Sequence, residues 1–247
     1  MFPHFLIFVV STGRCGTMTL DALCRLSSSA LSHHEPHPLM GDLNAILYHD
    51  PKQDLWPAIT DKRRKYFQAA TVQNVGYVET ASQNNFIIPT LLKRLPDCRV
   101  VHLVRNPRQV IRSCIRRGTY CPRDRTKRLV PREGTNAHDL WPTYTPYQKN
   151  AWRWMEINQL GLELRREYPT RYLCISSERM FVGEKETLYN LYRFIKSRVP
   201  DMAAISAVLG KQLNAQKTGV FDPPAAWEKH IWEIIGDTAS ILGCVAE

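Results

Sequence analysis

The sequence predicts an α/β fold in which helices flank a mostly parallel central sheet. Short apolar, β-branched runs alternate with segments of helical periodicity, and the first run is apolar at every position, as in a strand covered on both faces. Repeated strand–helix alternation produces parallel neighbours, because each helix returns the chain to the edge where the previous strand began. We expect a single domain over residues 1–247, a length that can bury one sizeable core.

The elements are expected in a regular order along the chain. The first strand, residues 5–10, runs into a Gly-containing turn and a helix over residues 17–26. Further strands are expected at residues 30–32, 75–79, 99–104 and 172–175, and further helices at 86–95, from Pro107 onward, 146–168, 186–196 and 225–242. Residues 40–70 are expected to form helical pieces, with the charged run 61–65 as a solvated face. Residues 118–147 show neither the helical nor the strand pattern of apolar residues. They are interpreted as a long Pro- and Arg-rich connection.

The composition indicates anionic partners and a reducing environment. The net charge of +10 is compatible with a phosphorylated nucleotide, an acidic glycan, nucleic acid or a membrane surface. Seven cysteines form an odd set without a Cys-x-x-Cys pair, which argues against a disulfide framework and against structural zinc. The apolar run 5–10 is too short to span a bilayer. We therefore expect a cytoplasmic protein without a membrane span.

The segment Ser11-Thr12-Gly13-Arg14-Cys15-Gly16-Thr17 predicts an anion-binding loop. It lies between a strand and a helix, where backbone N–H groups and the positive end of the helix dipole converge. The two glycines allow close approach of the backbone, and Arg14 adds a charged donor. A triphosphate-hydrolysing P-loop needs a Lys before its Ser/Thr, and Thr17 occupies that place here. The loop is therefore a poor triphosphatase site, although a tight turn without a ligand remains an alternative.

A second motif lies around the fourth predicted strand. Arg105 stands at the end of this strand, and Ser113 follows eight residues later, two turns into the next helix. Both side chains can therefore face one phosphate. Taken separately, an Arg capping a strand and a Ser on a solvated helix face are ordinary structural features. For the two motifs together, in this order, that ordinary interpretation is much less favoured.

These two motifs resemble those of the sulfotransferase superfamily, which uses 3'-phosphoadenosine 5'-phosphosulfate (PAPS). The resemblance implies a P-loop-like three-layer fold and transfer of a sulfuryl group to a hydroxyl or amine, leaving 3',5'-adenosine bisphosphate (PAP) without any metal. The cofactor-binding residues that it implies are Thr12, Gly13, Arg14, Cys15, Gly16, Thr17 and Met18 for the phosphosulfate, and Arg105 and Ser113 for the 3'-phosphate. Lys217 corresponds to the family's C-terminal loop, or is an ordinary solvated lysine.

The catalytic residues depend on which branch of the family the chain resembles. The cytosolic steroid and phenol enzymes carry a Lys in the loop and a Lys-Thr-His segment, where this chain has Arg14 and Glu79-Thr80. It is more similar to bacterial, carbohydrate and protein-tyrosine types, whose base is usually a Glu just after the second strand. Glu35 holds that place, with His34 and Glu79 as alternatives, unless residues 34–36 form an ordinary polar loop. Glu79 is equally well interpreted as a buried carboxylate paired with an Arg, and Arg14 would stabilise developing charge.

Two other functions and the nature of the acceptor stay open at this stage. A nucleotide kinase or related phosphotransferase is disfavoured by the missing Gly-Lys-Ser/Thr, and a non-catalytic nucleic-acid-binding protein has no recognisable motif here. Zinc binding by His33, His34 and His37 is excluded because Pro36 breaks the helix that such a motif needs. We expect a small-molecule or glycan acceptor; the Arg-rich segment 116–132 is interpreted either as a site that gathers an anionic acceptor or, equally well, as a mobile exposed loop. No nucleic-acid partner is expected, and the oligomeric state is left open.

The predicted connection and the helix after it are also rich in aromatic residues. These residues are either core side chains or stacking surfaces for a sugar or aromatic acceptor. They are Trp141, Tyr144, Tyr147, Trp152 and Trp154.

Overall fold

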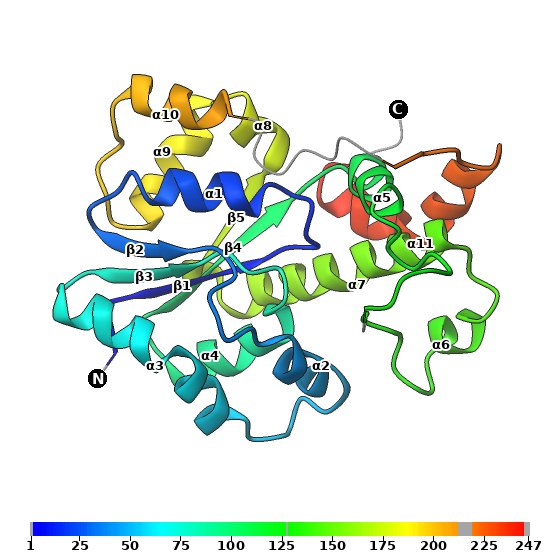
Figure 1. Ribbon diagram of the computed structural model, residues 1–247, viewed down its shortest axis with the longest axis horizontal. Coiled ribbons are helices and arrows are strands. Elements are labelled where there is room, and N and C mark those ends of the chain that lie inside the picture. The colour runs from blue at the N-terminus through cyan, green and yellow to red at the C-terminus, as the bar shows by residue number, and fades with distance from the viewer. Residues whose placement is uncertain (1, 127, 212–218, 245–247) are drawn as a thin grey trace. The chain divides into compact units, whose positions relative to one another are not determined.

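A five-stranded parallel sheet forms the centre of the fold (Figure 1). The computed structural model describes residues 2–126, 128–211 and 219–244. The strands are β1 (Leu6–Val10), β2 (Ala30–His33), β3 (Gly76–Glu79), β4 (Cys98–Val104) and β5 (Tyr172–Ser176). Their order across the sheet is β2-β3-β1-β4-β5, and every neighbouring pair is parallel. The predicted α/β class with a parallel central sheet is confirmed.

Helices connect the strands, and most of them match the expected segments within a few residues. They are α1 (Thr17–Cys24), α2 (Gly41–His49), α3 (Trp56–Val72), α4 (Ile88–Arg94), α5 (Pro107–Ile115), α6 (Asn136–Leu140), α7 (Pro146–Glu167), α8 (Ser177–Phe181), α9 (Lys185–Phe194), α10 (Met202–Leu209) and α11 (Trp227–Ile241). Two 3-10 helices, η1 (Asn85–Ile87) and η2 (Pro169–Arg171), precede α4 and β5. The short helices α6, α8 and α10 were not expected, because five to eight residues carry little periodic signal.

The described residues divide into two compact units. The first comprises Met1–Val104 and Leu160–Asn214 and contains the whole sheet. In this unit α1, α8, α9 and α10 lie over one face of the sheet, and α3 and α4 lie over the other (Figure 1). The second unit comprises Arg105–Gln159 and Ala215–Glu247. A single domain over the whole chain stays a prediction.

The sheet places the carboxyl ends of its strands at one edge. In the sheet register, Glu79 is opposite His33 of β2 on one side and Phe8 of β1 on the other. The carboxyl ends of these three strands are therefore aligned to within a few residues. The connection from β1 leads to β2 on one side of the sheet, and the connection from β4 leads to β5 on the other. In open α/β sheets, ligands bind beyond the carboxyl ends at such a reversal.

Burial explains why these segments become strands, and it corrects two expectations. Every residue of β1 is buried, as its continuous apolar run predicts. His33 belongs to β2 and not to the following loop. Arg63, within the charged run expected to be a solvated face, is only 1% exposed. None of the helices in the described ranges is both long and apolar enough to cross a bilayer.

Candidate active site

The loop after β1 adopts a backbone conformation suited to binding an anion. Gly13, Arg14 and Gly16 all have positive φ values, of 72°, 60° and 89°. Turns of this kind direct successive N–H groups toward one side. Helix α1 begins at Thr17, and its N-cap residue Gly16 offers no side chain to cap it. The first turn of α1 is thereby presented to an anion without a competing side-chain cap.

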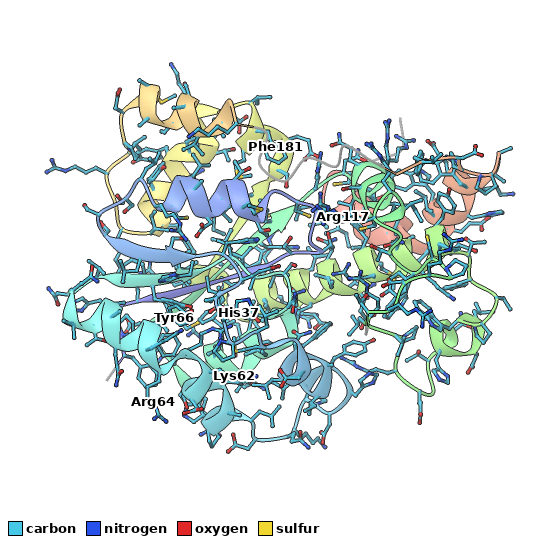
Figure 2. The ribbon with its side chains drawn as sticks, in the orientation of Figure 1. His37, Lys62, Arg64, Tyr66, Arg117 and Phe181 are labelled. Atoms are coloured by element: carbon cyan, nitrogen blue, oxygen red, sulfur yellow. The ribbon has the colours of Figure 1, made fainter. Side chains whose placement is uncertain are left out.

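Neighbouring segments of the first unit hold this loop in place. The Asn85 side chain pairs with both backbone groups of Ser11: the Ser11 N–H donates to Oδ1 at 2.9 Å, and Nδ2 donates to the Ser11 carbonyl at 3.1 Å. On the other side, the buried Ser177 hydroxyl donates to the Cys15 carbonyl at 2.6 Å. A Cβ on Gly16 would lie 2.5 Å from the Phe181 ring, so α8, where Figure 2 labels Phe181, requires glycine at this position.

Two side chains of the loop face inward and shape it. The Cys15 thiol lies 3.1 Å from the Thr12 hydroxyl and is fully buried. The N–H of Gly13 donates to the Ser11 hydroxyl at 3.1 Å. Thr12 and Cys15 were expected to bind the cofactor. Their side chains contact each other and thereby help to hold the conformation of the loop. Arg14 and Met18 are partly exposed.

Glu79 lies at the end of β3 in a dense buried network. Arg63 of α3 donates to both of its carboxylate oxygens, from Nε at 2.7 Å and from Nη2 at 2.8 Å. The Tyr77 hydroxyl donates to Oε2 at 2.6 Å, and the Asn84 side-chain amide donates to Oε1. Burial and the neighbouring Glu79 raise the pKa of Tyr77 well above its usual value, so this hydroxyl stays a donor. Glu79 is 0% exposed, and both of its carboxylate oxygens accept hydrogen bonds.

The loop between β2 and α2 carries the other two base candidates. Nδ1 of His34 lies 2.9 Å from the Thr80 carbonyl and 3.1 Å from the Thr80 hydroxyl. A carbonyl oxygen only accepts, so Nδ1 carries the proton and Nε2 is the nitrogen that can accept one. Glu35 is half-buried with φ 46°, a left-handed conformation uncommon for this residue type. Its carboxylate has no ion pair or hydrogen bond among the residues that the structure describes.

His33 is partly exposed and packs against aromatic rings of the first unit. Its ring packs on Tyr66 and Tyr77, with centroid distances of 4.8 and 5.8 Å. Burial, with a further contribution from Arg25, lowers the pKa of His33, which keeps the ring neutral at pH 7. Within the described ranges, no group of three or more His, Cys, Asp and Glu side chains is arranged to hold a metal ion.

The predicted 3'-phosphate residues belong to the second unit. Arg105 directly follows β4, its carbonyl accepts from Trp154 Nε1 at 3.0 Å, and its Nη2 donates to Gln109 at 2.8 Å. Ser113 lies on α5, whose N-terminus is capped by the Asn106 side chain. Because both residues lie outside the unit that holds the loop, their partnership with residues 11–17 stays a prediction. Lys217 lies outside the described residues.

The Arg-rich segment contains a compact turn organised by Asp124. Its carboxylate accepts from the N–H groups of Tyr120 and Thr126 at 2.9 and 3.0 Å, and from Arg128 Nε at 2.9 Å. Although burial opposes ionisation, the hydrogen bonds from Arg128 and Thr126 hold the pKa of Asp124 far below its usual value. Arg123 and Arg125, on either side of Asp124, are exposed.

The aromatic residues of the second unit divide between core and surface. Trp152 and Trp154 are 2% and 0% exposed and are therefore core side chains. Trp141 is partly exposed, packs edge-on against Trp152 at 5.0 Å between centroids, and has the Lys149 ammonium 5.1 Å from its ring. Tyr144 and Tyr147 are also partly exposed. A stacking role for these three residues stays a prediction.

Comparison with known proteins identifies the fold. No family model and no curated protein sequence matches the chain. Among solved structures, the sulfotransferase domain from the olefin synthase of Synechococcus PCC 7002 superposes with a TM-score of 0.56 at 16% identity, covering 96% of this chain and 95% of that one. The sulfotransferase domain from the curacin biosynthetic pathway superposes with a TM-score of 0.55 at 17% identity, covering 98% of both chains. The chain has the sulfotransferase fold.

Sequence reasoning about this sulfotransferase fold missed three residues that support the site. They are Arg63, Asn84 and Asn85, none of which was expected to contribute. A signal for Arg63 was present, because Ile59, Arg63, Phe67 and Ala70 recur at helical spacing and are the buried residues of α3. An arginine on the apolar face of a helix indicates a buried carboxylate partner. Asn84 and Asn85 gave no such signal, since polar residues after a strand usually form an ordinary turn.

Removing the Arg63 side chain is expected to destabilise the protein strongly. Arg63→Met leaves the buried Glu79 carboxylate without its cation, a change that typically costs about 3–5 kcal/mol. In a protein of this size, we expect the melting temperature to fall by roughly 6–20 °C. The neighbouring Arg64→Met is the matched control, because Arg64 is exposed and pairs only with exposed Asp61 at the surface. Equal effects of the two substitutions on thermal unfolding would contradict the assignment, and Arg63→Met/Glu79→Gln should recover part of the loss.

Proposed function

We propose that this chain transfers a sulfuryl group from PAPS to a hydroxyl or amine acceptor. The observation that carries the proposal is the sulfotransferase fold combined with a left-handed loop between β1 and the uncapped start of α1. A phosphotransferase acting on ATP is the rival. It would use a loop lysine for the terminal phosphates, and Thr17 stands in that position.

The proposed donor site uses the loop for the phosphosulfate and α5 for the 3'-phosphate. The N–H groups at the start of α1 and the Arg14 guanidinium would bind the sulfuryl and 5'-phosphate oxygens and stabilise the charge that develops there. Arg105 and Ser113 would bind the 3'-phosphate. These donors supply positive charge without a metal ion. Free cysteines, four of them buried, support our further proposal that the protein works in the reducing cytoplasm.

In the proposed reaction with a hydroxyl acceptor, the acceptor oxygen attacks the sulfur in line with the departing PAP. The new S–O bond forms as the bond from sulfur to the 5'-phosphate oxygen breaks, and the acceptor proton passes to a base. We assign this base to Glu35. Strand β2 lies two positions from β1, and two interstrand spacings of about 4.8 Å leave room for the acceptor between Glu35 and the loop. Glu79 is a weaker candidate, because its four hydrogen bonds occupy both oxygens.

We also propose an anionic acceptor, such as an acidic glycan or a charged small molecule. The Arg-rich segment 116–132 contains seven of the 33 basic residues and one of the 23 acidic residues, so it carries +6 of the net charge of +10. Charge concentrated on one segment attracts and orients an anion more strongly than charge spread evenly over a surface. The Asp124 turn holds Arg123 and Arg125 outward.

Binding of PAP tests the donor assignment without requiring the acceptor. At a PAP concentration one hundred times its Kd, we expect about 2.7 kcal/mol of stabilisation, or a rise in melting temperature of roughly 5–10 °C. Arg105→Ala and Ser113→Ala should each reduce this shift, whereas Arg193→Ala, an exposed arginine of α9, should not. Stabilisation by ATP with magnesium but not by PAP would refute the proposal. Stabilisation by oligonucleotides alone would indicate a nucleic-acid-binding protein.

Substitution of the base should affect turnover and not donor binding. Glu35→Gln keeps the size of the side chain but cannot accept a proton, so we expect kcat to fall about 10²–10⁴-fold while PAP binding is unchanged. Turnover is measured as transfer of labelled sulfate to an acceptor panel. If Glu35→Gln retains full kcat and His34→Gln does not, the base is Nε2 of His34. That outcome would still support sulfuryl transfer but would move the proton acceptor by one residue.

The charge of the acceptor can be tested with the same panel. We expect Arg123→Ser/Arg125→Ser to raise KM several-fold for anionic acceptors and to leave kcat unchanged, because these arginines are proposed to attract the acceptor and to take no part in proton transfer. The effect should weaken at high salt. Arg193→Ser/Arg198→Ser removes the same charge from exposed positions of the first unit and serves as the control. Equal KM values for neutral and anionic acceptors would exclude an anionic preference.

A further inference from the structure

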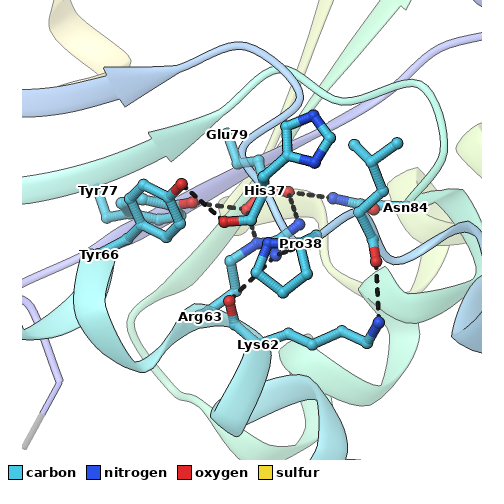
Figure 3. Close-up of polar contacts among 9 residues, drawn as sticks. His37, Pro38, Lys62, Arg63, Tyr66, Tyr77, Glu79 and Asn84 are labelled. Carbon is cyan, nitrogen blue, oxygen red and sulfur yellow. Dashed lines mark hydrogen bonds and ion pairs between the residues drawn. The ribbon is translucent and has the colours of Figure 1, made fainter.

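Three consecutive backbone carbonyls of the loop after β2 are each bound by a side chain from α3 (Figure 3). The Tyr66 hydroxyl donates to the His37 carbonyl at 2.9 Å, Arg63 Nη1 donates to the Pro38 carbonyl at 2.7 Å, and Lys62 Nζ donates to the Leu39 carbonyl at 3.0 Å. We call Lys62, Arg63 and Tyr66 the carbonyl clamp. Tyr66 lies four positions after Lys62 and three after Arg63, spacings that place side chains on one side of a helix.

The sequence of the loop explains why it needs donors from outside. Pro36 and Pro38 have no N–H group, so the segment cannot pair its own backbone as a regular turn or strand would. Its carbonyls must therefore be satisfied by side chains or by water. In Figure 2, His37, Lys62 and Tyr66 gather at this loop, whereas Arg64 points outward from α3.

The other end of the loop is bound to β3. The His34 ring donates to the Thr80 carbonyl, and the Thr80 N–H donates to the His33 carbonyl at 3.0 Å. Glu35 thus lies between a tether to Thr80 and the clamp that begins at His37. Its left-handed φ of 46° is a conformation that persists only where the surroundings hold it.

The Arg63–Glu79 pair orients the central member of the clamp. Nε and Nη2 of Arg63 are bound to the carboxylate, so Nη1 is left directed at the Pro38 carbonyl. Because both partners are buried, this orientation is shielded from solvent. Lys62 and Tyr66 flank Arg63 and are partly exposed, and Lys62 also pairs with Asp42 at 3.4 Å.

We propose that Lys62, Arg63 and Tyr66 are positioning residues that hold Glu35 in reach of the acceptor proton. This inference rests on the proposed function, in which Glu35 is the base. Proton transfer requires a base within hydrogen-bond reach, and a displacement of about 1 Å can cost a reaction about 10²-fold. The clamp fixes the backbone two to four residues after Glu35, and the His34 tether fixes the residue before it.

The test uses the two outer members of the clamp, because Arg63 variants would also lose the buried ion pair. Tyr66→Phe and Lys62→Met each remove one donor, and the double variant removes two. We expect kcat to fall about tenfold in each single variant and more in the double variant, with PAP binding unchanged and melting temperature within about 2 °C. Hydrogen exchange of the amides at residues 37, 39 and 40 should become faster in the same variants.

Matched controls separate this role from general effects of the substitutions. Tyr189→Phe and Lys93→Met make the same changes at exposed positions and should leave kcat and exchange unchanged. Asp42→Asn removes the ion pair of Lys62 but keeps its bond to Leu39, and should also be neutral. Lys62→Arg retains a donor and should recover most of the activity lost in Lys62→Met.

The outcomes distinguish the clamp from the proposed function itself. A wild-type protein that neither binds PAP nor transfers sulfate ends both proposals. If the wild type is active and the double variant keeps full kcat, the positioning role of the clamp is refuted and the proposed function is not. The same conclusion follows if PAP binding weakens and the melting temperature falls in the variants together with kcat. A lowered kcat with intact PAP binding, faster loop exchange and rescue by Lys62→Arg supports the positioning role.

Discussion

The buried ion pair between Arg63 and Glu79 is the interaction on which the candidate site depends. Removing two charges from water costs several kcal/mol per ion, and this cost is offset only where the geometry is good and further hydrogen bonds are present. Here two hydrogen bonds join Arg63 to Glu79 directly, and Tyr77 and Asn84 each donate a further hydrogen bond to the carboxylate. Nη1 of Arg63 donates to the Pro38 carbonyl and also to the Lys62 carbonyl. One ion pair thereby joins α3, β3 and the loop that carries Glu35.

Two adjacent asparagines connect this network to the anion-binding loop. Asn84 donates to Glu79, and Asn85 pairs with both backbone groups of Ser11 at the end of β1. A displacement of the ion pair would therefore also disturb the start of the loop. From the opposite side, Ser177 binds the Cys15 carbonyl, and the Phe181 ring covers Gly16. The proposed donor and base sites thus share their structural support, although they follow different strands.

The sheet and the charge distribution contribute different properties to the proposed reaction. The parallel register brings the ends of β1, β2 and β3 to one edge, so the anion-binding loop after β1 and the Glu35 loop after β2 leave the sheet at the same edge. The arginines of residues 116–132 would instead act on the acceptor in the proposed reaction. The two sulfotransferase domains compared above are only 16% and 17% identical to this chain, so the likeness concerns the backbone and not the acceptor site.

The sequence alone determined the α/β class, the five strands and the loop over residues 11–17, because apolar runs, helical spacing and paired glycines are local signals. Only the tertiary structure decided which charged side chains are buried and which groups form ion pairs and hydrogen bonds with one another. Arg63 and Glu79 are 16 residues apart, and Ser11 and Asn85 are 74 apart, distances at which no local pattern specifies a partner. The proton on Nδ1 of His34 likewise follows from a carbonyl 46 residues away. Long-range packing selects such partners, since a buried polar atom must find a hydrogen bond wherever the fold provides one.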